Sequence, residues 1–354
     1  MHGSSFRLKI LLLSHSFYPD IGGIESISEM LATEFVNAGH EVRLLTWSQS
    51  KEVKLFPYPV IRQPGKIALF REYAWADVVF ENNPCLRMAW AGVFFKRKSV
   101  TAIQTWISNM EGGVGLPELV KFMFLRRACS VIACSRAIQQ RYFKRAFIIG
   151  NPYKEGVFKI LPGIQRNMDF VFLGRLVSDK GADVLIQAFN RLLTESGPDG
   201  SLPSNITLTI IGSGPEYGFL KNLVTEFGLN DNVLFTGALT GAPLVECLNR
   251  HRFIVVPSRW EEPFGIVVLE GMACGCVPIV SNCGGLPDAT GNAGLLFKQA
   301  DTDALFLCMR KILASAELER KLRGEALQHL EAHRSVEVSA RYLSVFAQSL
   351  SNTG

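Results

Sequence analysis

The chain has 354 residues, of which 48% are hydrophobic and 19% are charged, and its formal net charge is +5. That length exceeds the size at which one hydrophobic core usually stops growing, so we expect two domains. The longest apolar runs, such as Ile10–Leu13, are far too short for a bilayer, which needs roughly 20 residues. Because Arg7 and Lys9 precede only a short apolar run, the N-terminus lacks a secretory pattern, and we expect a cytoplasmic protein.

The charge is unevenly distributed. Residues 1–150 contain 19 Lys and Arg against 11 Asp and Glu, a formal charge of +8, whereas residues 151–354 contain 18 against 21, a charge of −3. A basic N-terminal half favours an anionic partner, although ordinary scatter of solvated Lys and Arg gives the same count. No recognised nucleic-acid-binding motif accompanies the basic residues, so nucleic acid is not expected.

The eight cysteines include no C-x-x-C pair. Most lie within apolar segments, where cysteine packs as a small hydrophobic residue in a reducing compartment. Without paired ligand spacing, the sequence predicts no zinc site.

The first half of the chain alternates apolar strands with helices. Its first helix is predicted over Glu25–Ala38, where apolar residues recur at helical spacing and Gly39 ends the helix. The turn before this helix contains Gly22 and Gly23. The predicted strands are Leu8–Leu13, Glu41–Thr46, Val78–Phe80, Val100–Ile103, Ser130–Ala133 and Ala146–Ile149. This alternation with short links is typical of a parallel α/β sheet.

A turn-rich segment, 151–167, separates this half from a second α/β pattern. In the second pattern, strands are predicted at Phe170–Leu173, Ile206–Ile211, Val233–Phe235, Phe253–Val256 and Val277–Val280. Helices are predicted near Gly181–Leu193, Pro215–Phe227, Gly265–Ala273 and Asp301–Leu313, with two more over Leu318–Ser349. We therefore predict an N-terminal domain over 1–150, a second domain over 151–332, and a C-terminal helix over 333–354 that packs back towards the first domain.

The most informative motif is the stretch Glu261–Gly275, which follows a hydrophobic strand. Pro263 suits the first turn of a helix, whose N-terminal N–H groups and partial positive charge favour a phosphate. Gly265 leaves room for the backbone to approach a ligand closely. Glu262 lies just before this helix and Glu270 lies within it, so one carboxylate can hold a sugar and the other a ribose. The spacing is equally consistent with two glutamates that decorate an ordinary helix.

Further motifs follow other strands of the second half. Gly174-Arg175 ends a strand and Lys180-Gly181 opens a helix, at the edge where α/β sheets bind ligands. Two cations there can neutralise a diphosphate, although they can also be ordinary solvent-facing side chains. The turns Gly212-Ser213-Gly214-Pro215 and 281–288 also follow strands, but a G-x-G pattern is weak evidence alone.

The order of these motifs, from the Gly-Gly turn to the Gly-Gly-x-Pro-Asp turn at 284–288, resembles the family 4 retaining glycosyltransferases of the GT-B fold. The resemblance spans nearly the whole chain and is most specific from Phe170 to Phe297. It implies an α/β fold with two Rossmann-like domains that face a central cleft. It also implies an enzyme that transfers a sugar from a nucleotide-diphosphate sugar, with UDP favoured, to a saccharide or lipid-linked acceptor in surface polysaccharide or glycolipid synthesis.

The resemblance also assigns roles to residues. Arg175, Lys180 and Glu262 are the implied catalytic residues, with the two cations on the donor diphosphate and the glutamate on the donor sugar. The other implied donor-binding residues are Gly22, Gly23, Gly212, Ser213, Phe264, Gly265, Ile266 and Glu270, of which Glu270 holds the ribose. The chain offers no obvious covalent nucleophile. The resemblance implies a front-side displacement, in which the leaving diphosphate helps to deprotonate the acceptor.

One position departs from the family pattern. Members commonly carry a histidine after the strand that corresponds to Ser99–Ile103, whereas this chain has Gln104. Glutamine can hydrogen-bond a sugar hydroxyl but cannot carry a proton or a positive charge, so Gln104 is a candidate sugar contact. His15, near the Gly-Gly turn, is a candidate to compensate, although a loop histidine is more often incidental.

No cofactor or metal is expected beside the nucleotide sugar, which is a co-substrate. Asp301-Thr302-Asp303 matches the D-x-D pattern of metal-dependent transferases, but it directly precedes a predicted helix. Helix capping and the helix dipole explain these carboxylates without a metal.

Basic and aromatic residues gather in two segments of the first half, 90–98 and 116–145. At helical spacing such residues can bind an anionic membrane surface, which suits a lipid-linked acceptor and a peripheral location on the inner face of the membrane. The alternative is that the aromatic residues pack in the N-terminal core.

Two rival functions use the same fold. A nucleotide-sugar 2-epimerase needs catalytic carboxylates and a histidine, and the Glu-x7-Glu and Lys-Gly pattern favours the transferase over it. A non-catalytic partner subunit that binds a nucleotide sugar is supported only by Gln104. A dehydrogenase is not expected, because no G-x-G-x-x-G follows the first strand.

Overall fold

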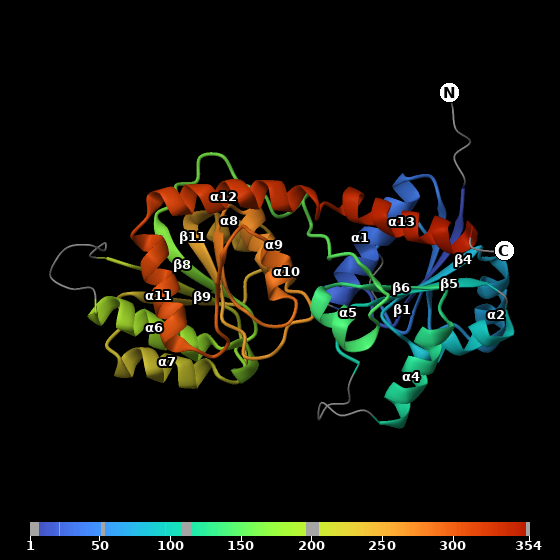
Figure 1. Cartoon of the computed structure of the whole chain (residues 1–354), viewed down its shortest axis with the longest axis horizontal. Helices are drawn as coiled ribbons and strands as arrows, with labels where there is room; N and C mark the ends of the chain where they lie inside the picture. The colour runs from blue at the N-terminus through green and yellow to red at the C-terminus, as the bar shows by residue number, and fades with distance from the viewer. Residues whose placement is uncertain are drawn as a thin grey trace. The chain divides into compact units, whose positions relative to one another are not determined.

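The computed structural model describes residues 7–20, 22–50, 54–95, 97–107, 115–195 and 205–351. The chain divides into two compact units (Figure 1). Unit 1 contains Met1–Pro152 together with Ser335–Gly354, and unit 2 contains Tyr153–Arg334. Unit 1 is therefore built from two separate stretches of the chain.

Among the described residues, unit 1 forms a parallel sheet of seven strands in the order β3-β2-β1-β4-β5-β6-β7. The strands are β1 (Lys9–Ser14), β2 (Glu41–Thr46), β3 (Val60–Arg62), β4 (Val78–Asn82), β5 (Lys98–Ile103), β6 (Ser130–Ala133) and β7 (Phe147–Ile148). The helices are α1 (Gly23–Asn37), α2 (Lys66–Trp75), α3 (Leu86–Ala89), the 3-10 helix η1 (Trp90–Phe94), α4 (Leu116–Arg127), α5 (Arg136–Tyr142) and α13 (Ser335–Ser351).

Helices cover both faces of the first sheet. Because neighbouring side chains of a strand point to opposite faces, Val79 and Phe80 of β4 belong to different layers of the core. Val79 packs in an apolar cluster with α2 residues such as Leu69. Phe80 contacts Tyr342 and Phe346 of α13, with ring centroids 5.4 Å apart in both pairs. The C-terminal helix thus completes one face of unit 1.

In the described part of unit 2, six parallel strands follow the order β10-β9-β8-β11-β12-β13. The strands are β8 (Met168–Leu173), β9 (Leu208–Ile211), β10 (Val233–Gly237), β11 (His251–Val256), β12 (Val277–Ser281) and β13 (Leu295–Phe297). The helices are η2 (Ser178–Lys180), α6 (Ala182–Thr194), α7 (Tyr217–Glu226), α8 (Gly241–Arg250), α9 (Ile266–Ala273), α10 (Leu286–Thr290), α11 (Thr302–Leu313) and α12 (Ala316–Glu331). Figure 1 shows α6, α7 and α11 on one side of this sheet and α8, α9 and α12 on the other.

The strand order fixes where each unit can bind a ligand. In unit 2 the chain moves outwards from β8 through β9 to β10, and then returns to place β11 on the other side of β8. The connections after β8 and β11 therefore leave the sheet in opposite directions, and open α/β sheets bind ligands at such a switch point. Unit 1 has the corresponding switch point between β1 and β4. The predicted α/β class with two parallel sheets is confirmed.

Candidate ligand site at the carboxyl edge of the second sheet

Two predicted site residues meet beside the switch point of unit 2. Lys180, at the end of η2, forms an ion pair through Nζ with Oε1 of Glu262, which follows β11. The same carboxylate oxygen accepts a hydrogen bond from Ser258 Oγ at 3.0 Å, and Ser258 is buried. The side chains of Lys180 and Glu262 are 21% and 14% exposed. The pair is therefore held by the protein and still reachable from solvent.

Arg175 follows β8 at the same edge of the sheet and is exposed. Its guanidinium has no ion-pair partner among the residues that the structure describes. A solvated guanidinium that no carboxylate neutralises is available for a phosphate, which it can bind through two parallel hydrogen bonds.

Glycines let the loops at this edge pack backbone against backbone. Gly181 has φ +67°, and a Cβ there would lie 2.1 Å from the carbonyl oxygen of Pro257. Gly212 has φ +148°, and its Cβ would lie 1.9 Å from the carbonyl oxygen of Gly174. The glycine of the G-x-G turn is therefore required by loop packing, whether or not a ligand is bound, while the neighbouring Ser213 is exposed.

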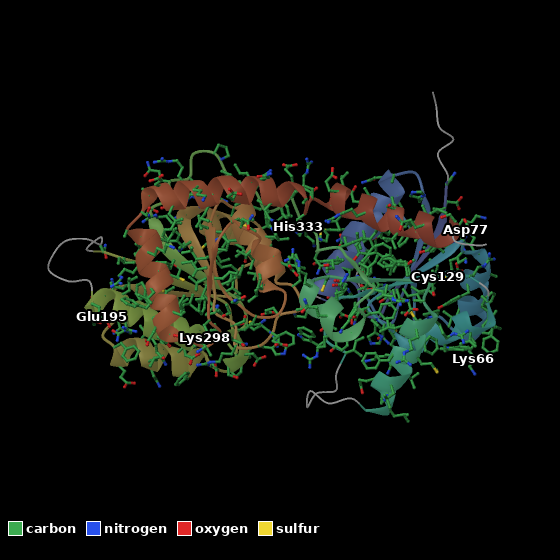
Figure 2. The ribbon with its side chains drawn as sticks, viewed as in Figure 1. Lys66, Asp77, Cys129, Glu195, Lys298 and His333 are labelled. Atoms are coloured by element: carbon green, nitrogen blue, oxygen red, sulfur yellow. The ribbon has the colours of Figure 1, made fainter. Side chains whose placement is uncertain are left out.

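Helix α9 begins at Ile266, after Gly265, which has φ +105°. Phe264 is 2% exposed, and its ring packs against His333, with ring centroids 5.6 Å apart; Figure 2 labels His333 after the end of α12. The Phe264 side chain is therefore packed inside unit 2. The amides of Gly265 and Ile266 donate to no acceptor within the described ranges, so they are available to an anion at this helix start.

Glu270 lies within α9 and is partly buried. Burial raises the pKa of its carboxyl group to about 7, and the positive charge of Lys154 opposes that rise. The group thus changes its charge near neutral pH, and a carboxyl that accepts ribose hydroxyls is compatible with this environment.

The Gly-Gly turn lies in unit 1, beside that unit's own switch point. Gly22 is the N-cap residue of α1 and Gly23 is its first residue. Gly22 has an extended backbone, and the Glu25 carboxylate folds back over its Cα, so that a Cβ on Gly22 would lie 2.4 Å from Glu25 Oε2.

Gln104 belongs to a buried polar network of unit 1. Its side chain is buried, and its Nε2 donates to Asn82 Oδ1 at 3.0 Å and to the Tyr342 hydroxyl at 3.2 Å. Asn82 in turn donates to Ser28 Oγ at 2.7 Å. The buried Gln104 Oε1 has no hydrogen-bond partner in the described structure. Gln104 therefore joins the end of β5 to α13, and its candidate role as a sugar contact stays a prediction.

The D-x-D stretch caps a helix, as the sequence suggested. Asp301 is the N-cap residue of α11 and accepts a hydrogen bond from the Ala304 amide at 2.9 Å. Asp303 forms an ion pair with Arg191 of α6. The described residues contain no group of three or more His, Cys, Asp and Glu side chains that could hold a metal ion.

Residues outside the sequence motifs also shape the site. Ser258 binds Glu262, Lys154 acts on Glu270, and Arg259 pairs with Asp183 in the first turn of α6. Ser258 and Arg259 stand directly before the Glu-x7-Glu motif, and Asp183 stands just after Lys180-Gly181. Their closeness to the motifs is a signal in the sequence, but their partners become visible only when the loops are folded.

The basic and aromatic segments of unit 1, 90–98 and 116–145, are described except at Lys96, which lies outside the described residues. No helix within the described ranges is long and apolar enough to cross a membrane.

The chain shows similarity to known proteins at two levels. Residues 159–329 match the family model described as glycosyl transferases group 1. An uncharacterized glycosyltransferase of Methanocaldococcus jannaschii is 36% identical over 125 residues, which cover 35% of this chain and 30% of that protein. D-inositol 3-phosphate glycosyltransferase of Jonesia denitrificans is 31% identical over 195 residues, 52% of this chain and 45% of that protein. The similarity thus spans less than half of the length of these two relatives.

Solved structures match over nearly the whole chain. Sucrose-phosphate synthase from Thermosynechococcus elongatus has a TM-score of 0.75 at 20% identity and covers 97% of this chain and 99% of its own. Anabaena HepE in complex with UDP has a TM-score of 0.79 at 19% identity, with 96% and 100% covered. At such identities the similarity establishes the fold, and the fold is GT-B.

Proposed function

We propose that this chain is a retaining glycosyltransferase that uses a nucleotide-diphosphate sugar, because residues 159–329 match the family model of glycosyl transferases group 1. The observation that carries the proposal is the Lys180–Glu262 ion pair at the switch point, with the exposed Arg175 at the same edge of the sheet. Such a site offers cations to a diphosphate and a carboxylate to sugar hydroxyls. A UDP-sugar is favoured because three structures of Anabaena HepE contain, respectively, UDP, UDP together with glucose, and UDP-glucose.

In the proposed reaction, the bond between the anomeric carbon and the diphosphate breaks as the acceptor oxygen bonds to the same face of that carbon. The acceptor proton passes to the departing diphosphate, which carries away the bonding electron pair. Arg175, Lys180 and the amides at the start of α9 stabilise the developing negative charge. Glu262 orients the donor sugar and Glu270 the ribose, and the protein supplies no metal or other cofactor.

The proposed acceptor is a saccharide or lipid-linked molecule of surface polysaccharide or glycolipid synthesis. The excess of positive charge in residues 1–150 supports an anionic acceptor or membrane surface. In unit 1, the amides of Gly22 and Gly23 stand at the start of α1 and are proposed to donate hydrogen bonds to a phosphate. A peripheral location on the inner face of the membrane follows from the same proposal.

The test is a mass-spectrometric measurement of nucleoside diphosphate release from UDP-, GDP-, ADP- and dTDP-sugars, without added metal. Arg175→Ala is the informative variant, because this side chain is exposed and removing it should leave the fold intact. We expect slow hydrolysis of one donor by the wild type and a loss of at least about 100-fold in the variant.

Other outcomes separate the rival functions. Binding of a donor without release would favour the non-catalytic partner subunit, and conversion of the donor to an isomeric nucleotide sugar would favour the 2-epimerase. An Arg175→Ala variant with a near-normal rate would remove Arg175 from the mechanism.

A further inference from the structure

Two loops that carry proposed catalytic residues are joined by a side-chain pair outside the motifs. The Arg259 guanidinium donates two parallel hydrogen bonds to the Asp183 carboxylate, Nη1 to Oδ1 at 2.8 Å and Nη2 to Oδ2 at 2.5 Å. Asp183 lies in the first turn of α6 and is 7% exposed, whereas the Arg259 side chain is 37% exposed. The positive end of the α6 dipole also stabilises the Asp183 carboxylate.

Backbone contacts reinforce this connection. The amides of Arg259 and Trp260 both donate to the carbonyl oxygen of Asp179, at 2.7 and 3.2 Å. The carbonyl oxygen of Arg259 accepts a hydrogen bond from Gln299 Nε2. The stretch 179–183 therefore lies directly against the stretch 257–262, and the missing Cβ of Gly181 makes that approach possible.

Each of the two stretches presents one proposed catalytic residue, Lys180 on the first and Glu262 on the second. We propose that Arg259 and Asp183 are a positioning pair that fixes the distance and orientation between Lys180 and Glu262. This inference rests on the proposed function, because it concerns the same site. A bidentate guanidinium–carboxylate contact is suited to the task, since it fixes direction as well as distance.

The physical reason is competition for Glu262 when a donor binds. The Lys180 ammonium neutralises Glu262 in the structure, and a bound diphosphate would draw that ammonium towards itself. Glu262 then keeps its hydrogen bond from Ser258 and depends on the backbone of its own loop for its position. If that loop drifts by about 1 Å, turnover can fall on the order of 100-fold while ground-state binding changes little.

The first test measures by hydrogen exchange whether the Arg259–Asp183 positioning pair holds its loop in place, and it does not depend on activity. In Arg259→Gln, the amides of Arg259 and Trp260 should exchange faster than in the wild type, because their loop loses its side-chain anchor. The matched control is Arg191→Gln, which also removes an arginine of unit 2 that binds carboxylates, namely Glu195 at 2.7 Å and Asp303. Figure 2 labels Glu195 just after the end of α6, away from the η2 end of that helix. If these amides exchange in Arg259→Gln at the wild-type rate, Arg259 and Asp183 do not act as a positioning pair.

The second test measures kcat and KM with the donor identified by nucleotide release. Arg259→Gln and Asp183→Asn should each lower kcat by about 10- to 100-fold and change KM by less than about threefold. The double variant should be no worse than the more affected single variant, because the two side chains act as one unit. Arg259→Lys keeps the charge without the bidentate geometry and should recover only part of kcat.

The two proposals fail in different ways. A wild type that neither binds nor cleaves any nucleotide sugar defeats the proposed function. The hydrogen-exchange result then still shows whether Arg259 and Asp183 hold their loops together. Normal kcat in Arg259→Gln, or a rise in KM alone, would overturn the positioning role, provided that Arg191→Gln behaves like the wild type. Thermal unfolding of every variant identifies a loss of kcat that follows from a loss of folded protein.

Discussion

Glu270 illustrates at the level of one residue how a binding site opposes folding. Its carboxyl group is partly buried in α9, and burial raises its pKa from the ordinary value of 4.5 to about 7. Lys154 favours the charged form, but its effect is smaller than that of burial. A group whose pKa is higher in the folded state than in the unfolded state binds a proton on folding, so ionisation weakens the fold.

We expect Glu270→Gln to stabilise the protein above neutral pH. At about pH 4 the carboxyl is largely protonated in both states, so the stability of wild type and variant should differ little. Between the unfolded pKa and the folded pKa of about 7, the unfolded wild type releases its proton while the folded one retains it, and wild-type stability falls. At about pH 8 the variant should gain about 1–3 kcal/mol in the free energy of unfolding.

Urea denaturation of the full chain between about pH 4 and about pH 8 measures this difference. Glu317→Gln is the control, because Glu317 is exposed at the start of α12. Equal pH dependence in wild type and Glu270→Gln would contradict the raised pKa. If the gain in stability is accompanied by weaker nucleotide binding, the Glu270 carboxylate lowers the stability of the fold and is needed for binding.

At the level of elements, the loops that follow the strands of unit 2 are shaped by their contacts with one another. Gly212→Ala would place a Cβ 1.9 Å from the Gly174 carbonyl oxygen, at φ +148°. Gly228→Ala makes a matched control, since Gly228 has φ +68° and nothing within 4 Å of its Cβ position. The control should lose about 1–2 kcal/mol from backbone strain alone.

We expect Gly212→Ala to lose at least about 2 kcal/mol more than Gly228→Ala in urea denaturation, because backbone atoms must move apart. Donor affinity should fall as well, since the loop after β8 carries Arg175. Equal losses in the two variants would mean that the loops adapt without resistance, and the packing argument would then fail.

The same contacts explain how far the sequence alone predicts this protein. The strands at Glu41–Thr46 and Ser130–Ala133 were predicted with the observed bounds, because buried parallel strands read as short apolar runs. Helix α2 was not predicted, since its apolar pattern is irregular: Ile67 is 89% exposed, whereas Glu72 is 1% exposed and accepts a hydrogen bond from Arg43 at 2.6 Å. A buried carboxylate that pairs with a partly exposed arginine leaves no periodic signal.

For the candidate site, the motifs name candidate residues but do not show the contacts between them. Lys180 and Glu262 were both named from the sequence, but nothing in the sequence shows that they pair with each other. Gln104 is a candidate sugar contact from the sequence, and the structure adds that its amide donates to Asn82 and Tyr342. Tyr342 is far along the chain and reaches Gln104 only because α13 belongs to unit 1, so local patterns cannot reveal this contact.

At the level of the whole molecule, the uneven charge coincides with an exposed apolar face on α4. Leu116, Leu119 and Met123 are 76%, 57% and 54% exposed, and their spacing places them on one face of the helix. Arg126 and Arg127 stand exposed in its last turn. Exposed apolar residues beside cations are typical of a helix that lies on an anionic membrane surface.

The neighbouring 3-10 helix η1 extends this surface. Val93 and Phe94 are 48% and 67% exposed on η1. A cavity of about 90 Å³ is lined by both Val93 and Arg127, so η1 and α4 adjoin there. A surface formed by such residues of α4 and η1 can gain both apolar burial and attraction to anionic lipids.

We therefore expect the protein to float with phosphatidylglycerol vesicles and not with phosphatidylcholine vesicles, and to dissociate as salt is raised. The double reversal Arg126→Glu with Arg127→Glu should abolish flotation, because it repels the lipid phosphates at the end of the apolar face. Arg310→Glu with Lys311→Glu, on α11 of unit 2, changes the net charge by the same amount and should float like the wild type. If both double variants lose flotation equally, binding follows total charge, and the assignment to α4 is wrong.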